Sequence, residues 1–234
     1  MSIFDSHPDQ IARFEALLDT EDDREERTQA VEAAIRIAEA LVQACPDDAD
    51  AHQCLGLAWY HFPGSSSWRS WHCRQALGQA LKIDPGQEFA RHYLACLTFD
   101  QERYQEALEI LGESNFDYFV DRDQEWRALK NQELKIVCML RTSTGAFPQT
   151  EFDSFVERFH DAQQREDRDV ALGSWVWPHE LREHAEWMIA TDVKRDDPRI
   201  LPLLDFFSRI GYSDSFWDPR LEQNQGEQAV DARP

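Results

Sequence analysis

Hydrophobic side chains recur with a helical period along most of the chain. Apolar residues three or four positions apart lie on one face of an α-helix, and residues 8–19, 28–45 and 123–141 each show this spacing. The spacing is clearest at Phe152, Phe155, Val156 and Phe159. No segment alternates polar and apolar residues over a useful length, as a half-buried strand would. The sequence therefore predicts an all-α fold.

Residues 49–111 contain two helix pairs that superimpose in one register. The equivalent positions are His52, Leu55, Gly56, Trp59, Cys73, Leu77 and Pro85 in the first pair and Arg91, Leu94, Ala95, Thr98, Ala107, Leu111 and Phe119 in the second. Upstream, Ala34, Ala38 and Pro46 repeat the spacing of the second helix. This pattern resembles the tetratricopeptide repeat family, whose signature is W-x2-L-G-x2-Y, then A-x3-F and a proline. The resemblance covers roughly residues 28–112, and a generic array of helical hairpins is the alternative.

Small residues and prolines have a physical role in this pattern. Gly56 and Ala95 stand where two helices cross, and a larger side chain would push the helix axes apart. Pro46 and Pro85 end one pair and open the next, because the residue before a proline disfavours the helical conformation. These prolines are 39 residues apart, whereas the family period is about 34 residues. We expect the excess to form an enlarged turn at residues 62–68.

The resemblance implies a right-handed superhelical array of antiparallel helix pairs, that is, a tetratricopeptide-like α-solenoid. Residues 1–117 would hold the repeats, residues 118–217 further helical pairs packed on the array, and residues 218–234 a polar, disordered tail. The last helix has two candidate starts, at Pro198 and at Pro202, since proline suits the first turn of a helix.

The resemblance also implies a binding surface, because in this family the first helix of each pair lines a concave groove. The groove positions are Asp50, Gln53, Leu57 and Tyr60 in the first pair and Phe89, His92, Cys96, Phe99 and Asp100 in the second. Packing against a neighbouring helix is the alternative role for Phe89 and Phe99. Trp68 and Trp71 are a second candidate surface, since tryptophan is enriched in interface hot spots. Their alternative is to fold back over their own helical hairpin.

A net charge of −21 narrows the class of partner. Residues 1–120 carry 22 acids and 9 bases, and residues 121–234 carry 23 acids and 15 bases, so both halves are acidic. Binding phosphates requires a basic surface, and neither nucleic acid nor an anionic membrane is therefore an expected partner. An acidic surface attracts positive partners instead, so we expect a protein or peptide of basic character. The sequence does not indicate an oligomeric state.

The sequence carries no signal for export or membrane insertion. Its first residues contain neither a basic region nor a long apolar run, and no stretch reaches the roughly 18 apolar residues of a membrane-spanning helix. We therefore expect a cytoplasmic protein. The five cysteines are odd in number and scattered through the predicted helices, so we expect reduced, buried thiols.

Candidate catalytic and metal-binding residues form no recognised motif. His179 and His184 lie five positions apart, whereas a zinc-protease motif needs two histidines four positions apart on one helix face. We interpret each as a surface histidine that pairs with a glutamate four residues away. A second group flanks the enlarged turn and the following pair: His61, His72, Cys73 and His92. Its spacing matches no metal motif, so we expect no metal, no cofactor and no catalytic residue.

These observations favour a non-enzymatic interaction module that binds a peptide or protein segment in a concave helical groove. One alternative is an acidic immunity or inhibitor protein that neutralises a basic toxin. A metal-dependent hydrolase that uses the histidines and cysteine beside the enlarged turn is the third hypothesis.

Overall fold

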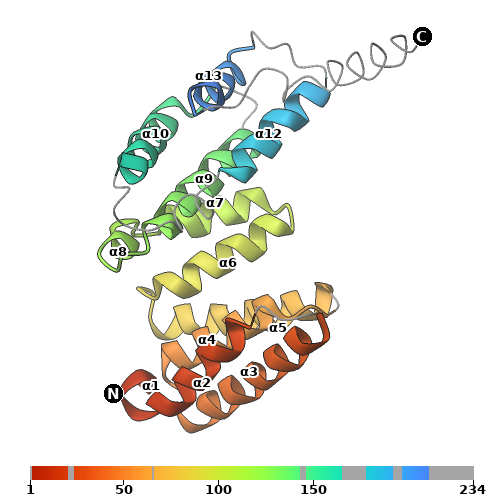
Figure 1. The fold of residues 1–234 in the computed structure, drawn as a ribbon, viewed down its shortest axis with the longest axis vertical. Helices are drawn as coiled ribbons and strands as arrows, with labels where there is room; N and C mark the ends of the chain where they lie inside the picture. Colours follow the sequence, from red (N-terminus) through yellow and green to blue (C-terminus); the bar gives the residue numbers. More distant parts are fainter. Residues whose placement is uncertain are drawn as a thin grey trace, which may run out of the picture. The chain divides into compact units, whose positions relative to one another are not determined.

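A computed structural model describes residues 2–20, 24–64, 66–142, 146–164, 178–191 and 197–210. Within these residues every regular element is a helix and none is a strand, which confirms the predicted all-α fold (Figure 1). None of these helices is both long enough and apolar enough to cross a membrane. The residues predicted to form the tail, 218–234, lie outside the described part of the chain.

The helices of the described residues have the following bounds: α1 (Ile3–Ser6), α2 (Pro8–Leu18), α3 (Arg24–Ala44), α4 (Ala49–His61), α5 (Ser66–Ile83), α6 (Glu88–Asp100), α7 (Tyr104–Gly112), α8 (Asp117–Val120), α9 (Glu125–Thr142), α10 (Gln149–Gln164), α12 (His179–Ala190) and α13 (Leu201–Arg209). The last of them begins beside Pro202, the second of its two predicted starts, and Pro202 occupies the first turn.

The chain divides into two compact units, Met1–Asn131 and Gln132–Pro234. The division falls inside α9. Side chains beyond α7 still pack on α6 within the first unit. The buried ring of Phe119 lies 5.4 Å from the ring of Phe89 and 5.8 Å from that of His92.

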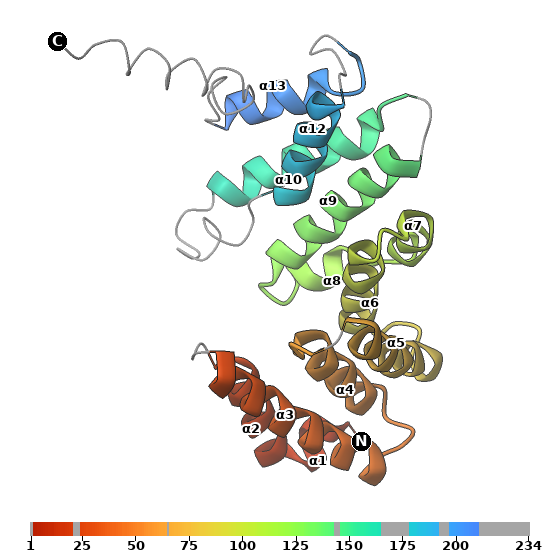
Figure 2. The same cartoon turned by 90° about the vertical axis from the view of Figure 1, so that its right-hand side faces the viewer.

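In the first unit, successive helices from α1 to α7 pack against one another. Contacts join α2 to α3, α3 to α4, α4 to α5, α5 to α6 and α6 to α7, and α4 also lies beside α6 (Figure 2). One hydrophobic core runs through α1 to α6. Its largest fully buried side chains are Ile3, Phe14, Leu41, Leu77 and Leu97.

The turns before α4 and α6 contain the same backbone hydrogen bonds. In the first turn the amide of Asp48 donates to the carbonyl of Cys45 at 3.1 Å, and in the second the amide of Gln87 donates to the carbonyl of Asp84 at 3.1 Å. A side chain from the following helix also reaches the proline carbonyl of each turn. Nε2 of His52 donates to the carbonyl of Pro46 at 2.8 Å, and the guanidinium of Arg91 donates to the carbonyl of Pro85.

The enlarged turn is shorter than the sequence predicted. Helix α5 already begins at Ser66, so part of the expected turn at residues 62–68 is an additional first turn of this helix. By contrast, only three residues separate α6 from α7, which begins at Tyr104. The excess over the family period therefore adds both a longer turn and helix length at the start of α5.

Gly56 allows α4 and α5 to approach closely. A Cβ atom at this position would lie 2.3 Å from Cδ2 of Leu77 and 3.2 Å from its backbone nitrogen. Leu77 is fully buried, so it has little room to move away. The requirement for a small residue at position 56 follows directly from this contact.

Aromatic side chains form the core of the second unit. Phe206 of α13 lies between three phenylalanines of α10, at ring distances of 5.7 Å from Phe152, 5.9 Å from Phe155 and 5.5 Å from Phe159. All four are buried. The helical spacing of phenylalanines along α10 therefore marks its packed face, as the sequence indicated.

A buried glutamate fixes the start of α12. Oε1 of Glu133, on α9, accepts hydrogen bonds from the backbone amides of Glu180 at 2.9 Å and Leu181 at 3.1 Å. The first amides of a helix have no partner within the helix, and a negative charge there also opposes the positive end of the helix dipole. Glu133 thus caps α12 from a distant position in the sequence.

The interpretation of His184 as a surface residue was wrong. His184 is buried, and burial lowers the pKa of its imidazole to about 4, with a further lowering from the charge of Arg141. It lies on the same side of α12 as the buried Leu181, Ala185 and Met188, so its face belongs to the core. His179 is exposed, as expected.

Replacing Gly56 by alanine should lower the free energy of unfolding by about 1 to 2 kcal/mol, because overpacking against Leu77 outweighs the better helix propensity of alanine. Gly78 provides a matched control within α5, since a Cβ atom there would meet no atom within 4 Å. Gly78→Ala should stabilise the chain by about 0.5 to 1 kcal/mol. Urea denaturation of both variants measures the two values, and equal effects would contradict the close contact.

Replacing Glu133 by alanine should destabilise the second unit by about 1 to 3 kcal/mol, because two helix amides lose their acceptor in a buried place. Glu133→Gln keeps one acceptor oxygen and should cost less. Thermal unfolding, monitored by circular dichroism, tests whether stability decreases from the wild type to Glu133→Gln to Glu133→Ala. If both variants unfold like the wild type, Glu133 does not hold α12.

Candidate functional site

The predicted groove residues have very different accessibilities. Three of them, Gln53, His92 and Cys96, are buried, and His92 retains only 3% of its exposed surface. Asp50 is half-buried and accepts hydrogen bonds from Oγ of Ser2 at 2.7 Å and from Nε2 of Gln87 at 2.5 Å. These four side chains therefore serve the packing or the hydrogen bonding of the first unit.

The remaining groove residues are accessible. Leu57, Tyr60, Phe89 and Phe99 are half-buried, and Asp100 at the end of α6 is exposed. Tyr60 and Leu57 pack against the core from its edge. The rings of Phe99 and Tyr104 meet edge to face at 5.5 Å. Apart from Asp100, the accessible part of the predicted groove is thus apolar and aromatic.

Two of these accessible aromatic residues, Tyr60 and Phe89, belong to a larger surface, which we call the inner aromatic face. It consists of Tyr60 and His61 of α4, Phe89 and Tyr93 of α6, and Trp126 and Arg127 of α9. The rings of Tyr60 and Tyr93 lie 5.3 Å apart, and those of His61 and Tyr93 lie 6.4 Å apart. Because α4 lies beside α6, residues 33 positions apart come into contact here.

Arg127 is the central charge of the inner aromatic face. Its Nη1 donates to the hydroxyl of Tyr93 at 2.9 Å, and its Nε donates to Oε1 of Gln124 at 2.9 Å. Its guanidinium carbon lies 4.1 Å from the ring centre of Trp126 and 5.4 Å from that of Phe89. These contacts hold the guanidinium against three aromatic rings.

Burial dominates the ionisation of this surface. Burial raises the pKa of Tyr60 and of Tyr93, and the charge of Arg127 opposes the rise at Tyr93. Burial also lowers the pKa of His61, with smaller lowering from Arg27 and Arg127. The two tyrosines are therefore neutral hydroxyl groups at neutral pH, and His61 is an uncharged ring.

Four members of this surface were not predicted from the sequence: His61, Tyr93, Trp126 and Arg127. Tyr93 and His61 follow predicted groove residues by one position and lie on the helix edge rather than its centre. Trp126 and Arg127 belong to α9, which the sequence assigned to a later helical pair. A helical wheel of α4 and α6 would have included the first two, whereas no local signal connects α9 with α6.

His92, Cys96 and Asn131 form a chain of contacts like that of a cysteine nucleophile, a base and an orienting amide. Nδ1 of His92 donates to Oδ1 of Asn131 at 2.6 Å, and Sγ of Cys96 lies 3.9 Å from Nε2 of His92. All three residues are buried. Burial lowers the pKa of His92 to about 3, so the imidazole is neutral and cannot pair with a thiolate. The arrangement stabilises the junction of α6 and α9 and has no access for a substrate.

The histidines and cysteine beside the enlarged turn do not converge on a metal site. Cys73 is fully buried, and burial raises the pKa of its thiol to about 12. His72 instead stacks on Trp59 with a ring distance of 4.4 Å. Among the described residues, no group of three or more histidine, cysteine, aspartate or glutamate side chains could hold a metal ion.

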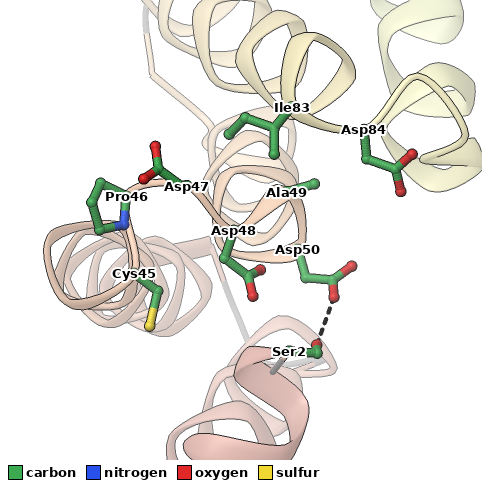
Figure 3. A pocket seen from close by; sticks show the side chains of 9 residues that line it. All are labelled: Ser2, Cys45, Pro46, Asp47, Asp48, Ala49, Asp50, Ile83 and Asp84. Carbon is green, nitrogen blue, oxygen red and sulfur yellow. Dashed lines mark hydrogen bonds between the residues drawn. The ribbon is translucent and has the colours of Figure 1, made fainter.

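A cavity of about 510 Å³ lies between α1, the start of α4 and the end of α5 (Figure 3). It is lined by Ser2, Cys45, Pro46, Asp47, Asp48, Ala49, Asp50, Ile83 and Asp84. Three of its four carboxylates already accept hydrogen bonds from the chain. Asp48 binds the amides of Ile3 and Ala51, and Asp84 binds the amide of Gly86. These carboxylates fix α1 and the two proline turns.

The tryptophans near the start of α5 are exposed. Trp68 and Trp71 retain 55% and 57% of their surface, although both rings contact His72. The two tryptophans therefore contact their own helical hairpin and are also exposed to solvent, so both predicted roles remain open to them.

The stability of the chain should decrease as the pH falls from 7 to 5, in part because of His92. Its folded pKa lies below the ordinary value of 6.5, so its stabilising effect is present above that value and is lost as the unfolded state gains a proton. His92→Gln should lower stability at pH 7 and flatten this pH dependence. Urea denaturation at several pH values measures the slope. His179→Gln removes an exposed histidine as the control, and equal slopes in the two variants would contradict the assignment.

Comparison of the chain with protein-family models, with curated proteins and with solved structures finds no match.

Proposed function

We propose that the chain is a non-enzymatic interaction module of the tetratricopeptide type, which binds a segment of another protein on its inner aromatic face. The observation that carries this proposal is the composition of that face. The half-buried Phe89 and Trp126 and the buried Tyr93 surround one arginine, Arg127, and aromatic residues and arginine are the types enriched in binding hot spots.

The repeated turns support a solenoid of helix pairs. The same backbone hydrogen bonds and the same contact to a proline carbonyl recur 39 residues apart before α4 and α6. A recurring turn sets a recurring angle between successive pairs. Stacked pairs with a constant angle form a superhelix, and the first helices of its pairs then line one side.

The charge of the chain supports a basic segment as the partner. The exposed Asp100 lies at the end of α6, and its charge contributes, after burial and Cys96, to the raised pKa of the neighbouring Tyr60. At low ionic strength, the net charge of −21 also attracts positive partners over a longer range. A partner segment would place aromatic anchors on this face and its lysine or arginine side chains toward Asp100, away from Arg127.

Tyr60→Ala should weaken binding of the partner by about 10- to 100-fold, which corresponds to the loss of one hot-spot side chain. The natural partner is captured from extract of the source cells with immobilised wild-type protein, and its affinity for each variant is measured by calorimetry. Phe4→Ala is the control, since it removes a ring that is 45% exposed on α1.

Circular dichroism of Tyr60→Ala separates lost binding from lost folding, because Tyr60 also touches the core. A folded Tyr60→Ala protein that binds the captured partner with wild-type affinity would show that the inner aromatic face is not the binding surface. Weaker binding by both variants would point to a general effect of the exposed aromatic residues.

A further inference from the structure

All 45 acidic residues lie outside residues 51–83, which contain Arg69, Arg74 and Lys82 as their charged side chains. This stretch includes the whole of α5. The surroundings of the buried Cys73 are also positive. After burial, which raises the pKa of its thiol, the charges that act on this pKa are Arg69 and Arg74, and both lower it. In a strongly acidic chain, α5 therefore carries positive charges and no negative one.

An aromatic cluster, which we call the outer tryptophan cluster, lies at the start of this basic helix. It consists of Trp59 of α4, Phe62 after α4, and Trp68, Trp71 and His72 of α5. Trp68 lies edge-on to Trp59 at 5.0 Å and to His72 at 4.5 Å, and Trp71 lies edge-on to His72 at 4.7 Å. Trp59 is the buried member of the cluster. The stacked rings below hold the two exposed tryptophans in place, so they form a fixed apolar surface.

The positions of the side chains around α5 define the surroundings of this cluster. At about 100° per residue, Trp71, Trp68 and His72 occupy an arc of about 100°. Arg69 lies about 60° beyond one edge of the arc and Arg74 about 60° beyond the other. Arg74 is compensated by Glu106, at 2.7 Å. Arg69 has no ion pair among the described residues.

The exposed stripe continues along α5 without an acidic residue. Gln75, Gln79 and Lys82 are exposed and follow the tryptophans on the same side of the helix. The stripe from Trp68 to Lys82 is about 21 Å long, the length of a helix of about 14 residues. It offers large apolar anchors at one end and amides in the middle. Lys82 adds a positive charge at the other end, two residues before the exposed Asp84.

We propose that this stripe of α5 binds an acidic amphipathic helix of a partner protein, at a surface separate from the inner aromatic face. Apolar side chains of that helix cover Trp68 and Trp71, and its acidic side chains lie toward Arg69 and Lys82. Charges more than about 8 Å away are largely screened at physiological salt, so the basic character of α5 acts locally despite the acidic remainder of the chain.

A random peptide library tests which charge a bound peptide carries and whether it binds at the two tryptophans. Peptides of about 20 residues, long enough to form a helix that matches the stripe, are selected on the wild-type protein and counter-selected on a Trp68→Ala/Trp71→Ala variant. The enriched peptides should be acidic and carry apolar residues at helical spacing. Basic peptides among those that depend on the two tryptophans would overturn the proposal, as would the absence of any such peptide.

One enriched peptide, synthesised without tryptophan and labelled with fluorescein, then serves as the probe for fluorescence anisotropy. Its affinity should fall at least tenfold with Trp68→Ala/Trp71→Ala and severalfold with Lys82→Glu. Trp187→Ala, which removes a tryptophan that is 47% exposed in the second unit, should leave the affinity unchanged. Unaltered affinity in the double variant or in Lys82→Glu would overturn the proposal.

Two further measurements distinguish this stripe from the inner aromatic face and from a membrane-binding surface. Tyr60→Ala should leave the affinity for the acidic peptide unchanged, so failure here and failure of the inner aromatic face are distinguishable. Vesicles of phosphatidylserine test a membrane contact through the same tryptophans. Sedimentation of the wild type, but not of the double variant, with these vesicles would overturn the peptide proposal. Circular dichroism establishes that each variant is folded.

Discussion

The contact between Gly56 and Leu77 sets the geometry on which the first unit depends. It brings α4 and α5 together without space for a single additional carbon atom. The position of α5 then determines where α6 can pack, and α6 in turn contacts α7, Phe119 and Asn131 of α9. A wider separation at this point would change the angle of every later helix in the unit.

The sequence predicted those features that depend on local spacing. The helical class, the small residue at position 56 and the packed face of α10 all follow from residues a few positions apart, and the structure agrees with each. The accessibility of the groove could not be predicted in the same way. His92 is covered by Asn131, which lies 39 residues further along the chain, and no local pattern links the two. The capping of α12 by Glu133 is a contact of the same long-range kind.

The two proposed surfaces originate from one turn of α4. Trp59 and Phe62, three positions apart, join the outer tryptophan cluster, whereas Tyr60 and His61 between them join the inner aromatic face. Since residues i and i+3 share a helix face that i+1 and i+2 do not, four consecutive aromatic residues supply both sides. The inner aromatic face contains Arg127 and lies on the same helix as Asp100, whereas α5 carries basic residues alone, and this difference would give the two surfaces different partners.

The extra residues before Arg69 do not change the register of the repeat in the rest of α5. From Cys73 to Ala107 and from Leu77 to Leu111 the spacing returns to 34 residues, so the insertion does not rotate the buried face of α5 relative to its neighbours. An evolving lineage could therefore lengthen or shorten this segment, or exchange its side chains, while the interior stays unchanged. Relatives of this chain would then differ most where α5 begins. Substitutions at Trp68 would change the exposed surface and leave the fold unchanged.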